Sequence, residues 1–193
     1  MTNRPTLETR RLLLRPFEAG DAQAIANLAG DAAVADTTLN IPHPYTLADA
    51  LAWIGTHAEN FAQRREVVLA VVRKEDGALL GACGLVLSPE HRRGELGYWV
   101  GKAYWGQGYC TEAARALVEY GFRTLGLERI YAQHFSRNPA SGRVMQKLGM
   151  RHEGHLRHHI QKRGQFEDLE IYGLLRQEYL AQSESAPPDP PAP

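Results

Sequence analysis

The stretch of sequence that decides the fold is ELGYWVGKAYWGQGYCTEA, which occupies residues 95–113. Its first six residues predict a strand, its closely spaced glycines predict a tight turn, and the apolar stripe that follows predicts a helix over about residues 111–125. The N–H groups that begin such a helix lack intrahelical partners and, together with the helix dipole, form an anion site. Glycines let these amides approach a phosphate, although a Gly-x-Gly turn alone can also bind nothing.

Outward from this stretch, strand and helix patterns alternate. Aliphatic or β-branched runs predict strands near residues 11–15, 67–72, 79–87, 130–135, 152–160 and 167–175. Helices are expected to begin at the capping residues Asp21, Thr46 and Asn138, and Gly149 is expected to end the last of them. The sum is an α/β domain with a mixed sheet.

Composition narrows the class of protein. The 193 residues carry 22 Lys and Arg against 22 Asp and Glu, so the formal net charge is zero, which argues against nucleic acid or an anionic membrane as partner. The longest aliphatic run, residues 67–72, is too short to cross a bilayer, and the N-terminus has no apolar segment typical of a secretory signal. Two cysteines cannot build a disulfide scaffold, so a cytoplasmic protein is expected.

The chain is predicted to form a single domain over residues 1–182, followed by a disordered Pro-rich tail over residues 183–193. The tail, SESAPPDPPAP, has no apolar residue larger than alanine and cannot bury anything. We interpret it as a solvated terminus rather than a ligand for a proline-binding partner.

Two separated motifs carry a resemblance to a known family. Residues 105–110, WGQGYC, match the pattern Gln/Arg-x-x-Gly-x-Gly/Ala with Trp105 and Cys110 as departures, and Thr-Glu-Ala follows. Residues 138–150, NPASGRVMQKLGM, match an Asn-x-x-Ser/Ala segment that ends in Lys-x-Gly-Phe. The sequence therefore resembles the GCN5-related N-acetyltransferase (GNAT) superfamily, and within it the RimJ/RimL-type branch, over about residues 7–178.

The resemblance implies a GNAT fold, with a mixed central β-sheet splayed between two parallel strands and flanked by about four helices. It implies acetyl-CoA as cosubstrate, with pantetheine pairing to backbone at residues 99–101 and pyrophosphate on the amides of the glycine turn. It implies direct transfer to the acceptor, so Cys110 is not expected to form an acyl-enzyme. The expected cofactor-binding residues are Trp99, Val100, Gly101, Gly106, Gln107, Gly108, Tyr109, Cys110, Thr111, Asn138 and Ser141.

The reaction that the resemblance implies is attack of a neutral amine on a thioester, which needs a base for the amine proton and an acid for the thiolate. Glu95 is the expected base, against the alternative of an exposed carboxylate at a strand end. Met145 stands where the family usually has a tyrosine that acts as general acid, so Ser141 is the expected acid here. The alternative is a helix serine that only donates a hydrogen bond to a carbonyl. Asn138 is expected to face pantetheine, to cap its helix, or both. Some ribosomal-protein acetyltransferases carry a glutamate where this chain has Ile160, so their mechanism is not carried over to this chain.

The histidines of residues 152–159 raise the question of a metal site. In a regular strand His152 and His158 face one side and His155 and His159 the other, so four ligands do not converge and no metal is expected. Contact of His158 or His159 with substrate is the favoured interpretation.

The resulting prediction is an acetyl-CoA-dependent N-acetyltransferase that acts on the N-terminal α-amine of a protein or peptide. The first alternative is a small amine as acceptor, such as a polyamine, an amino acid or a drug, and the second is a non-catalytic acyl-CoA-binding module. No nucleic acid or membrane partner is expected, and the protein is expected to be a monomer or homodimer.

Overall fold

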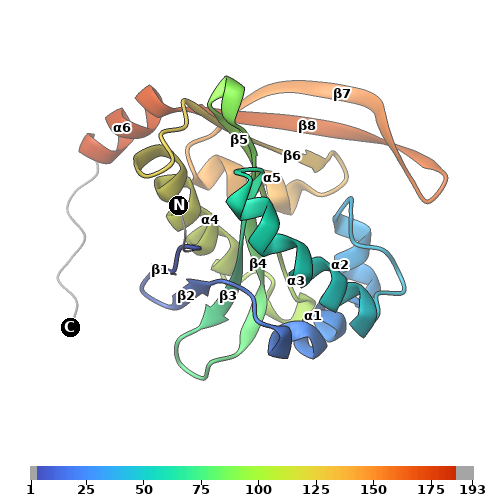
Figure 1. Ribbon diagram of the computed structural model, residues 1–193. Coiled ribbons are helices and arrows are strands. Elements are labelled where there is room, and N and C mark those ends of the chain that lie inside the picture. The colour runs from blue at the N-terminus through green and yellow to red at the C-terminus, as the bar shows by residue number, and fades with distance from the viewer. Residues whose placement is uncertain (1–3, 186–193) are drawn as a thin grey trace.

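The computed structural model describes residues 4–185 and contains one eight-stranded sheet (Figure 1). The strand order is β1-β2-β3-β4-β5-β6-β8-β7, and every neighbouring pair is antiparallel except β5 and β6. The strands are β1 Leu7–Glu8, β2 Leu12–Arg15, β3 Glu66–Arg73, β4 Leu79–Ser88, β5 Arg93–Val100, β6 Arg129–Phe135, β7 Arg151–Lys162 and β8 Gln165–Leu175. The helices are α1 Ala22–Ala29, α2 Ala32–Thr37, α3 Leu47–Ala62, α4 Tyr109–Arg123, α5 Pro139–Lys147 and α6 Arg176–Ser185.

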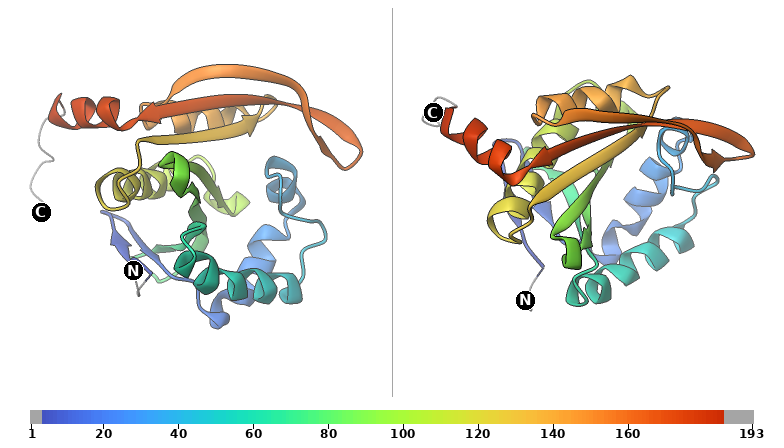
Figure 2. Two further views of the ribbon diagram at one scale, coloured as in Figure 1. Left: turned by 45° about the horizontal axis from the view of Figure 1, so that its top comes forward. Right: turned by 90° about the horizontal axis from the view of Figure 1, so that it is seen from above.

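The sheet splays open between its two parallel strands, as predicted. The β5–β6 ladder begins at Arg93 opposite Arg129, and its last printed rung joins Glu95 to Tyr131. Beyond this rung β5 continues to Val100 and diverges from β6, which pairs with β8 along its whole length from Arg129 to Phe135 (Figure 2). The opening therefore begins at Glu95.

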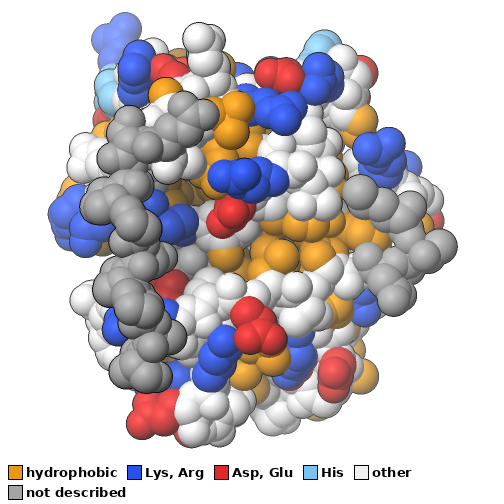
Figure 3. Space-filling model, turned by 90° about the vertical axis from the view of Figure 1, so that its left-hand side faces the viewer, with side chains coloured by type: hydrophobic (Ala, Val, Ile, Leu, Met, Phe, Trp, Pro, Cys, Tyr) orange, Lys and Arg blue, Asp and Glu red, His pale blue; other side chains and the backbone are white. Residues whose placement is uncertain are grey.

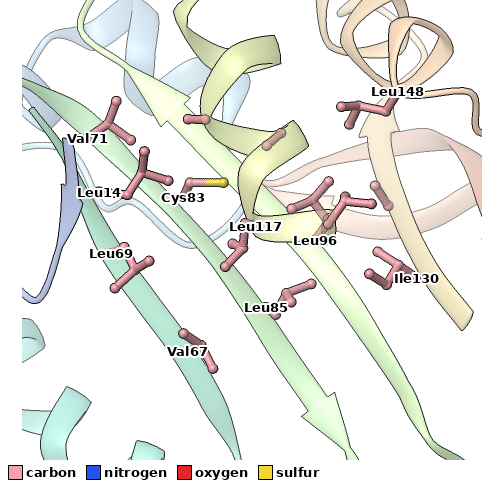
Figure 4. Close-up of a cluster of buried hydrophobic side chains, with 14 of the residues drawn as sticks. Leu14, Val67, Leu69, Val71, Cys83, Leu85, Leu96, Leu117, Ile130 and Leu148 are labelled. Carbon is pink, nitrogen blue, oxygen red and sulfur yellow. The ribbon is translucent and has the colours of Figure 1, made fainter. Parts of the chain in front are cut away.

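Two clusters of apolar side chains hold helices on opposite faces of the sheet. On one face, Leu85 and Ile130 pack with Leu117 of α4 (Figure 4). On the other face, Ile25 of α1 packs with apolar residues of β3 and β4. Because side chains alternate along a strand, β5 sends Leu96 and Val100 to the first cluster and Trp99 to the second.

The helix α4 lies close to the sheet because of a glycine. A Cβ atom at Gly121 would lie 2.7 Å from Cδ1 of Ile130 and 3.1 Å from Cδ1 of Leu85. The predicted stripe on this helix is otherwise filled by buried Leu117, Val118 and Phe122. The period of 3.6 residues thus predicted both the helix and the face that it buries.

The expectation of about four helices is too low, since the described residues contain six α-helices. The sequence analysis missed α2, which has only six residues, and α6. Tertiary packing explains α6, because the Tyr179 ring stacks on Phe122 with centroids 5.0 Å apart. This helix extends through Ser185, into the segment predicted to be disordered, and residues 186–193 of that segment lie outside the described residues.

The capping predictions had mixed outcomes. Thr46 begins α3, and its hydroxyl accepts a hydrogen bond from the N–H of Asp49. Asp21 stands at the start of α1 but makes no capping hydrogen bond, because its carboxylate accepts hydrogen bonds from Arg15 and from the Glu18 N–H.

Charged side chains of both signs lie on the outer surface, as the formal net charge of zero predicts. On the face shown in Figure 3, basic and acidic side chains are interspersed around a central apolar area. Within residues 4–185, the helices are all too short or too polar to span a membrane.

Candidate active site

A cavity of about 270 Å³ lies where β5, the glycine turn and the N-termini of α4 and α5 meet. Gly108, with φ of 81°, occupies the N-cap position of α4 and offers no side chain to cap it. The first N–H groups of α4 are therefore available at this cavity. Of the residues predicted to bind the cofactor, the cavity is lined by Trp99, Val100, Gly106, Gly108, Tyr109, Cys110, Thr111, Asn138 and Ser141.

Gly101 and Gln107 do not line this cavity. The Gly101 N–H donates to the Leu80 carbonyl at 2.8 Å, inside the sheet, so this amide is not free for pantetheine, and the pairing of pantetheine with the backbone of residues 99–101 stays a prediction. The Gln107 side chain donates to the Ala103 carbonyl at 2.9 Å, and a role for the Gln107 backbone N–H stays a prediction.

The backbone of β5 faces the opening at alternate residues. Because Gly101 bonds to β4, the antiparallel ladder turns the N–H and C=O groups of Trp99 to β4 as well, and those of Tyr98 and Val100 to the open side. The Trp105 indole N–H donates to the Val100 carbonyl at 2.9 Å. The tryptophan that departs from the family pattern thus ties the glycine turn to the end of β5.

Arg11 fixes the glycine turn from the other side. Its guanidinium donates to the Gln107 carbonyl at 3.1 Å and to the Glu112 carboxylate at 2.6 Å, and it lies over the Tyr109 ring. Burial alone would raise the pKa of Glu112, but hydrogen bonds from Thr9 and Arg11 outweigh it and lower the pKa. The turn is therefore held in place by charged contacts that span the fold.

The structure limits the roles that the side chains of Cys110 and Asn138 can have. Burial raises the pKa of the Cys110 thiol to about 12, which disfavours a reactive thiolate. Asn138 stands at the N-cap of α5 but makes no capping hydrogen bond, so the capping interpretation of its side chain is wrong.

A larger cavity of about 590 Å³ lies on the other side of the opening, where α2, α3, the segment between them and the ends of β6 and β8 meet β5. Its wall contains Glu95, Met145 and Ile160. Tyr98 and Ser141 line both cavities, so the two cavities meet at these residues.

Glu95 is half-buried in the wall of the larger cavity rather than exposed at a strand end. Its carboxylate accepts hydrogen bonds from the Gln133 amide at 2.7 Å and from the Tyr131 hydroxyl at 3.1 Å. Burial, together with the Glu95 charge, raises the pKa of Tyr131, which keeps that hydroxyl a donor. The sequence analysis missed both partners, although their spacing of two residues on β6 places them on one face.

Ser141 and Tyr98 form a contact across the opening. The Tyr98 hydroxyl donates to the Ser141 carbonyl at 2.9 Å and lies 3.0 Å from the Ser141 hydroxyl oxygen. Burial raises the pKa of Tyr98, so its hydroxyl is protonated at neutral pH. Met145, which has no proton to donate, is buried nearby in α5. Tyr98 was also missed, because no local pattern predicts a contact between β5 and α5.

The β7 histidines do not alternate as predicted. A register shift between His152 and Gly154 brings His152 and His155 to the same carboxylate, with nitrogen–oxygen distances to Glu170 of 2.7 and 2.8 Å. Hydrogen bonds from Ser136 and the two imidazoles lower the pKa of Glu170 to about 2. Among residues 4–185, no group of three or more His, Cys, Asp or Glu has an arrangement that would hold a metal ion.

The tip of the β7–β8 hairpin is attached to the segment after α2 (Figure 2). Lys162 is buried and donates to the carbonyls of Ala35 and Thr38, and burial lowers its pKa. Arg137 bridges Asp36 and Glu167 with nitrogen–oxygen distances of 2.7 and 2.9 Å. These contacts hold the segment that covers the larger cavity.

Comparison with known proteins identifies the family. A model of the acetyltransferase (GNAT) domain matches residues 11–151. The N-acetyltransferase YoaA of Bacillus subtilis is 32% identical over 173 residues, which are 89% of this chain and 97% of YoaA. The spermidine N(1)-acetyltransferase of Escherichia coli is 28% identical over 170 residues, which are 88% of each chain. The chain belongs to the GNAT acetyltransferase family.

Solved structures agree with this fold. A GNAT-family acetyltransferase from Bacillus anthracis has a TM-score of 0.81 at 27% identity, over 90% of this chain and 100% of that chain. RimL, a ribosomal L7/L12 alpha-N-protein acetyltransferase solved with coenzyme A, has a TM-score of 0.82 at 17% identity, over 90% and 99% of the two chains. The protein is thus an N-acetyltransferase of a family that uses acetyl-CoA, and RimL, from the branch that the sequence resembles, shares its fold.

Proposed function

We propose that this N-acetyltransferase acetylates the α-amine at the N-terminus of a protein or peptide. The supporting observation is the charge of the larger cavity, whose wall contains the carboxylates of Glu95 and Asp49 and none beyond them among the described residues. Asp49 is exposed at the start of α3, and one of its oxygens accepts hydrogen bonds from the N–H and hydroxyl of Thr46. Glu95 is therefore the one half-buried carboxylate of this wall among the described residues.

The pKa of the acceptor amine decides how strongly the reaction depends on a general base. An N-terminal amine has a pKa near 8, whereas a lysine or polyamine amine has a pKa near 10. At pH 7 the first is neutral in about a tenth of molecules and the second in about a thousandth. A single general base suits the first acceptor, and a polycation needs several carboxylates in its pocket.

Glu95 is the proposed base. The amine nitrogen attacks the thioester carbonyl, the C–N bond forms, and the amine proton passes to the Glu95 carboxylate directly or through water. The hydrogen bonds from Tyr131 and Gln133 fix both carboxylate oxygens and leave a lone pair on each for the proton.

Ser141 is the proposed acid, with Tyr98 as its partner. When the C–S bond breaks, the thiolate takes a proton from the Ser141 hydroxyl as Ser141 takes one from the Tyr98 hydroxyl, 3.0 Å away, and Tyr98 regains its proton from solvent. The Val100 N–H, on the open side of β5, is the proposed donor to the carbonyl oxygen as negative charge develops there. The residues that line the smaller cavity are the proposed site of acetyl-CoA, with its pyrophosphate at the start of α4.

A small amine remains the second candidate, because a spermidine acetyltransferase is among the relatives. The acids of β8 do not favour this acceptor. Glu167 is paired with Arg137, Glu170 with two histidines, and Asp168 accepts from the His158 N–H. A spermidine molecule would therefore have to break existing contacts. Location in the cytoplasm and a monomeric or homodimeric state also stay proposals.

The experiment is turnover with acetyl-CoA and a peptide whose α-amine and lysine side chain are both free. Mass spectrometry of the product is expected to place the acetyl group on the α-nitrogen. Acetylation of the lysine alone, or of spermidine while the peptide stays unmodified, would contradict the proposal.

A further inference from the structure

We propose that the larger cavity selects amines that carry a large apolar group, such as a peptide with phenylalanine or leucine as its first residue. This inference rests on the proposed function and specifies its acceptor. The volume of about 590 Å³ lies in the range of sites that enclose a whole organic ligand. The side chain of a first residue such as serine or alanine would leave most of this space unfilled.

The wall of the cavity is apolar on several sides. Its apolar side chains come from the segment between α2 and α3, from α3, from β6 and from β8. They include Leu39, Ile41, Tyr45, Trp53, Phe135 and Leu169. An apolar group that enters this space removes apolar area from water on both partners, which is the main source of binding free energy for such ligands.

Polar side chains line the cavity on two sides, with Asn40 and Asp49 on the covering side and Glu95 and Gln133 on the sheet. Glu95 lies at the start of the opening in the sheet, and the Gln133 amide beside it is already bonded to the Glu95 carboxylate. An amine at Glu95 thus places its attached group against the apolar wall. A second positive charge in that group would lose its water against the apolar wall, where Asp49, the other carboxylate among the described lining residues, is exposed at the start of α3.

The cavity is preformed because its cover is fixed. Lys162 donates to the carbonyls of Ala35 and Thr38 at the end of α2, and Arg137 pairs with Asp36. Thr46 and Asp49 cap the start of α3 at the other end of the covering segment. Both ends of the segment are thus held, and Leu39 within it keeps 46% of its surface exposed.

Leu39 and Leu47, eight residues apart in the chain, provide a matched pair of variants. Leu39 and Leu47 have exposed fractions of 46% and 44%, but Leu39 lines the cavity and Leu47 is not among the lining residues. Leu39→Asn therefore changes the wall, while Leu47→Asn makes the same chemical change outside it.

The test compares four acceptors with the full-length protein and acetyl-CoA at pH 7. They are two hexapeptides that differ only in phenylalanine or serine at the first position, phenethylamine, and spermidine. We expect kcat/KM for the phenylalanine peptide to exceed that for the serine peptide by at least about tenfold, the scale expected for burying a large apolar side chain. Leu39→Asn is expected to reduce this ratio by about fivefold, and Leu47→Asn to leave it unchanged.

The outcomes separate this inference from the proposed function. Equal or better turnover of the serine peptide, or equal effects of the two leucine variants, would overturn the inference and leave peptide acetylation standing. Turnover of phenethylamine with both peptides inert would support the apolar selection and overturn the peptide acceptor. Turnover of spermidine alone would overturn both.

Discussion

Replacing Glu95 by glutamine tests the proposed base with little change of shape. Tyr131 and Gln133 both donate to the Glu95 carboxylate, whereas a glutamine amide has one acceptor oxygen and one donor group. One of the two hydrogen bonds is lost or must reverse, which costs about 1 kcal/mol of stability and lowers Tm by about 2–4 °C. The fold and both cavities are expected to remain.

The effect on the reaction is expected to be much larger than the effect on stability. Loss of the proton acceptor lowers kcat at pH 7 by about 10²-fold, the lower end of the range for general bases. The deficit shrinks as pH rises through the pKa of the acceptor amine, because more of the amine is then already neutral and hydroxide can take the remaining proton. The affinity for acetyl-CoA is expected to stay unchanged, since the proposed acetyl-CoA cavity does not include Glu95.

The assay is detection of free thiol between pH 6 and 10, with calorimetric titration of acetyl-CoA. Glu66→Gln is the matched control, because Glu66 is also half-buried, pairs with the same residue of β4 as Glu95, and accepts from the Asn60 amide at 2.7 Å. An unchanged rate for Glu95→Gln at neutral pH, or an equal loss for Glu66→Gln, would refute the assignment of the base.

Three further predictions concern the glycine turn, the proposed acid and the core. Gly108→Asp places a negative charge and a Cβ atom at a φ of 81°, so calorimetry is expected to detect no acetyl-CoA binding, and a retained affinity would contradict the site. Ser141→Ala is expected to lower kcat by about 10-fold or more, and Tyr98→Phe by less. Both variants are expected to shift the alkaline limb of the profile of kcat against pH, and unchanged profiles in both would remove the pair from the mechanism. Gly121→Val adds a side chain whose Cβ atom alone would lie 2.7 Å from Cδ1 of Ile130, so it is expected to cost about 2–3 kcal/mol in denaturant unfolding, and an unchanged midpoint would contradict the packing.

The sequence predicted those helices and strands whose apolar residues recur with a clear local period. The strand, glycine turn and helix over residues 95–125 follow from spacing, and β3, β4, β5 and β6 were each predicted within a few residues. The register shifts in β7 were not predictable, because alternation assumes a regular strand and the extra residue that brings His152 and His155 together has no mark in the sequence.

The candidate site was predicted in part for the same reason. The anion site at the start of α4 depends on residues that are close together in the chain, and the resemblance located Glu95 and Ser141. The contact between Tyr98 and Ser141 and the burial of Lys162 depend on elements that meet only in the folded chain. Such long-range contacts leave no local pattern, and here they supply a partner for the proposed acid and hold the segment that covers the larger cavity.

The most direct test of the central claim is a competition between two acceptors. A peptide with a free N-terminal phenylalanine and an internal lysine is incubated with an equal concentration of spermidine, acetyl-CoA and the protein at pH 7, and the products are analysed by tandem mass spectrometry. Our account predicts one acetyl group on the α-nitrogen of the peptide, one free CoA thiol for each acetyl group, and little acetylspermidine. Efficient formation of acetylspermidine with an unmodified peptide would contradict it.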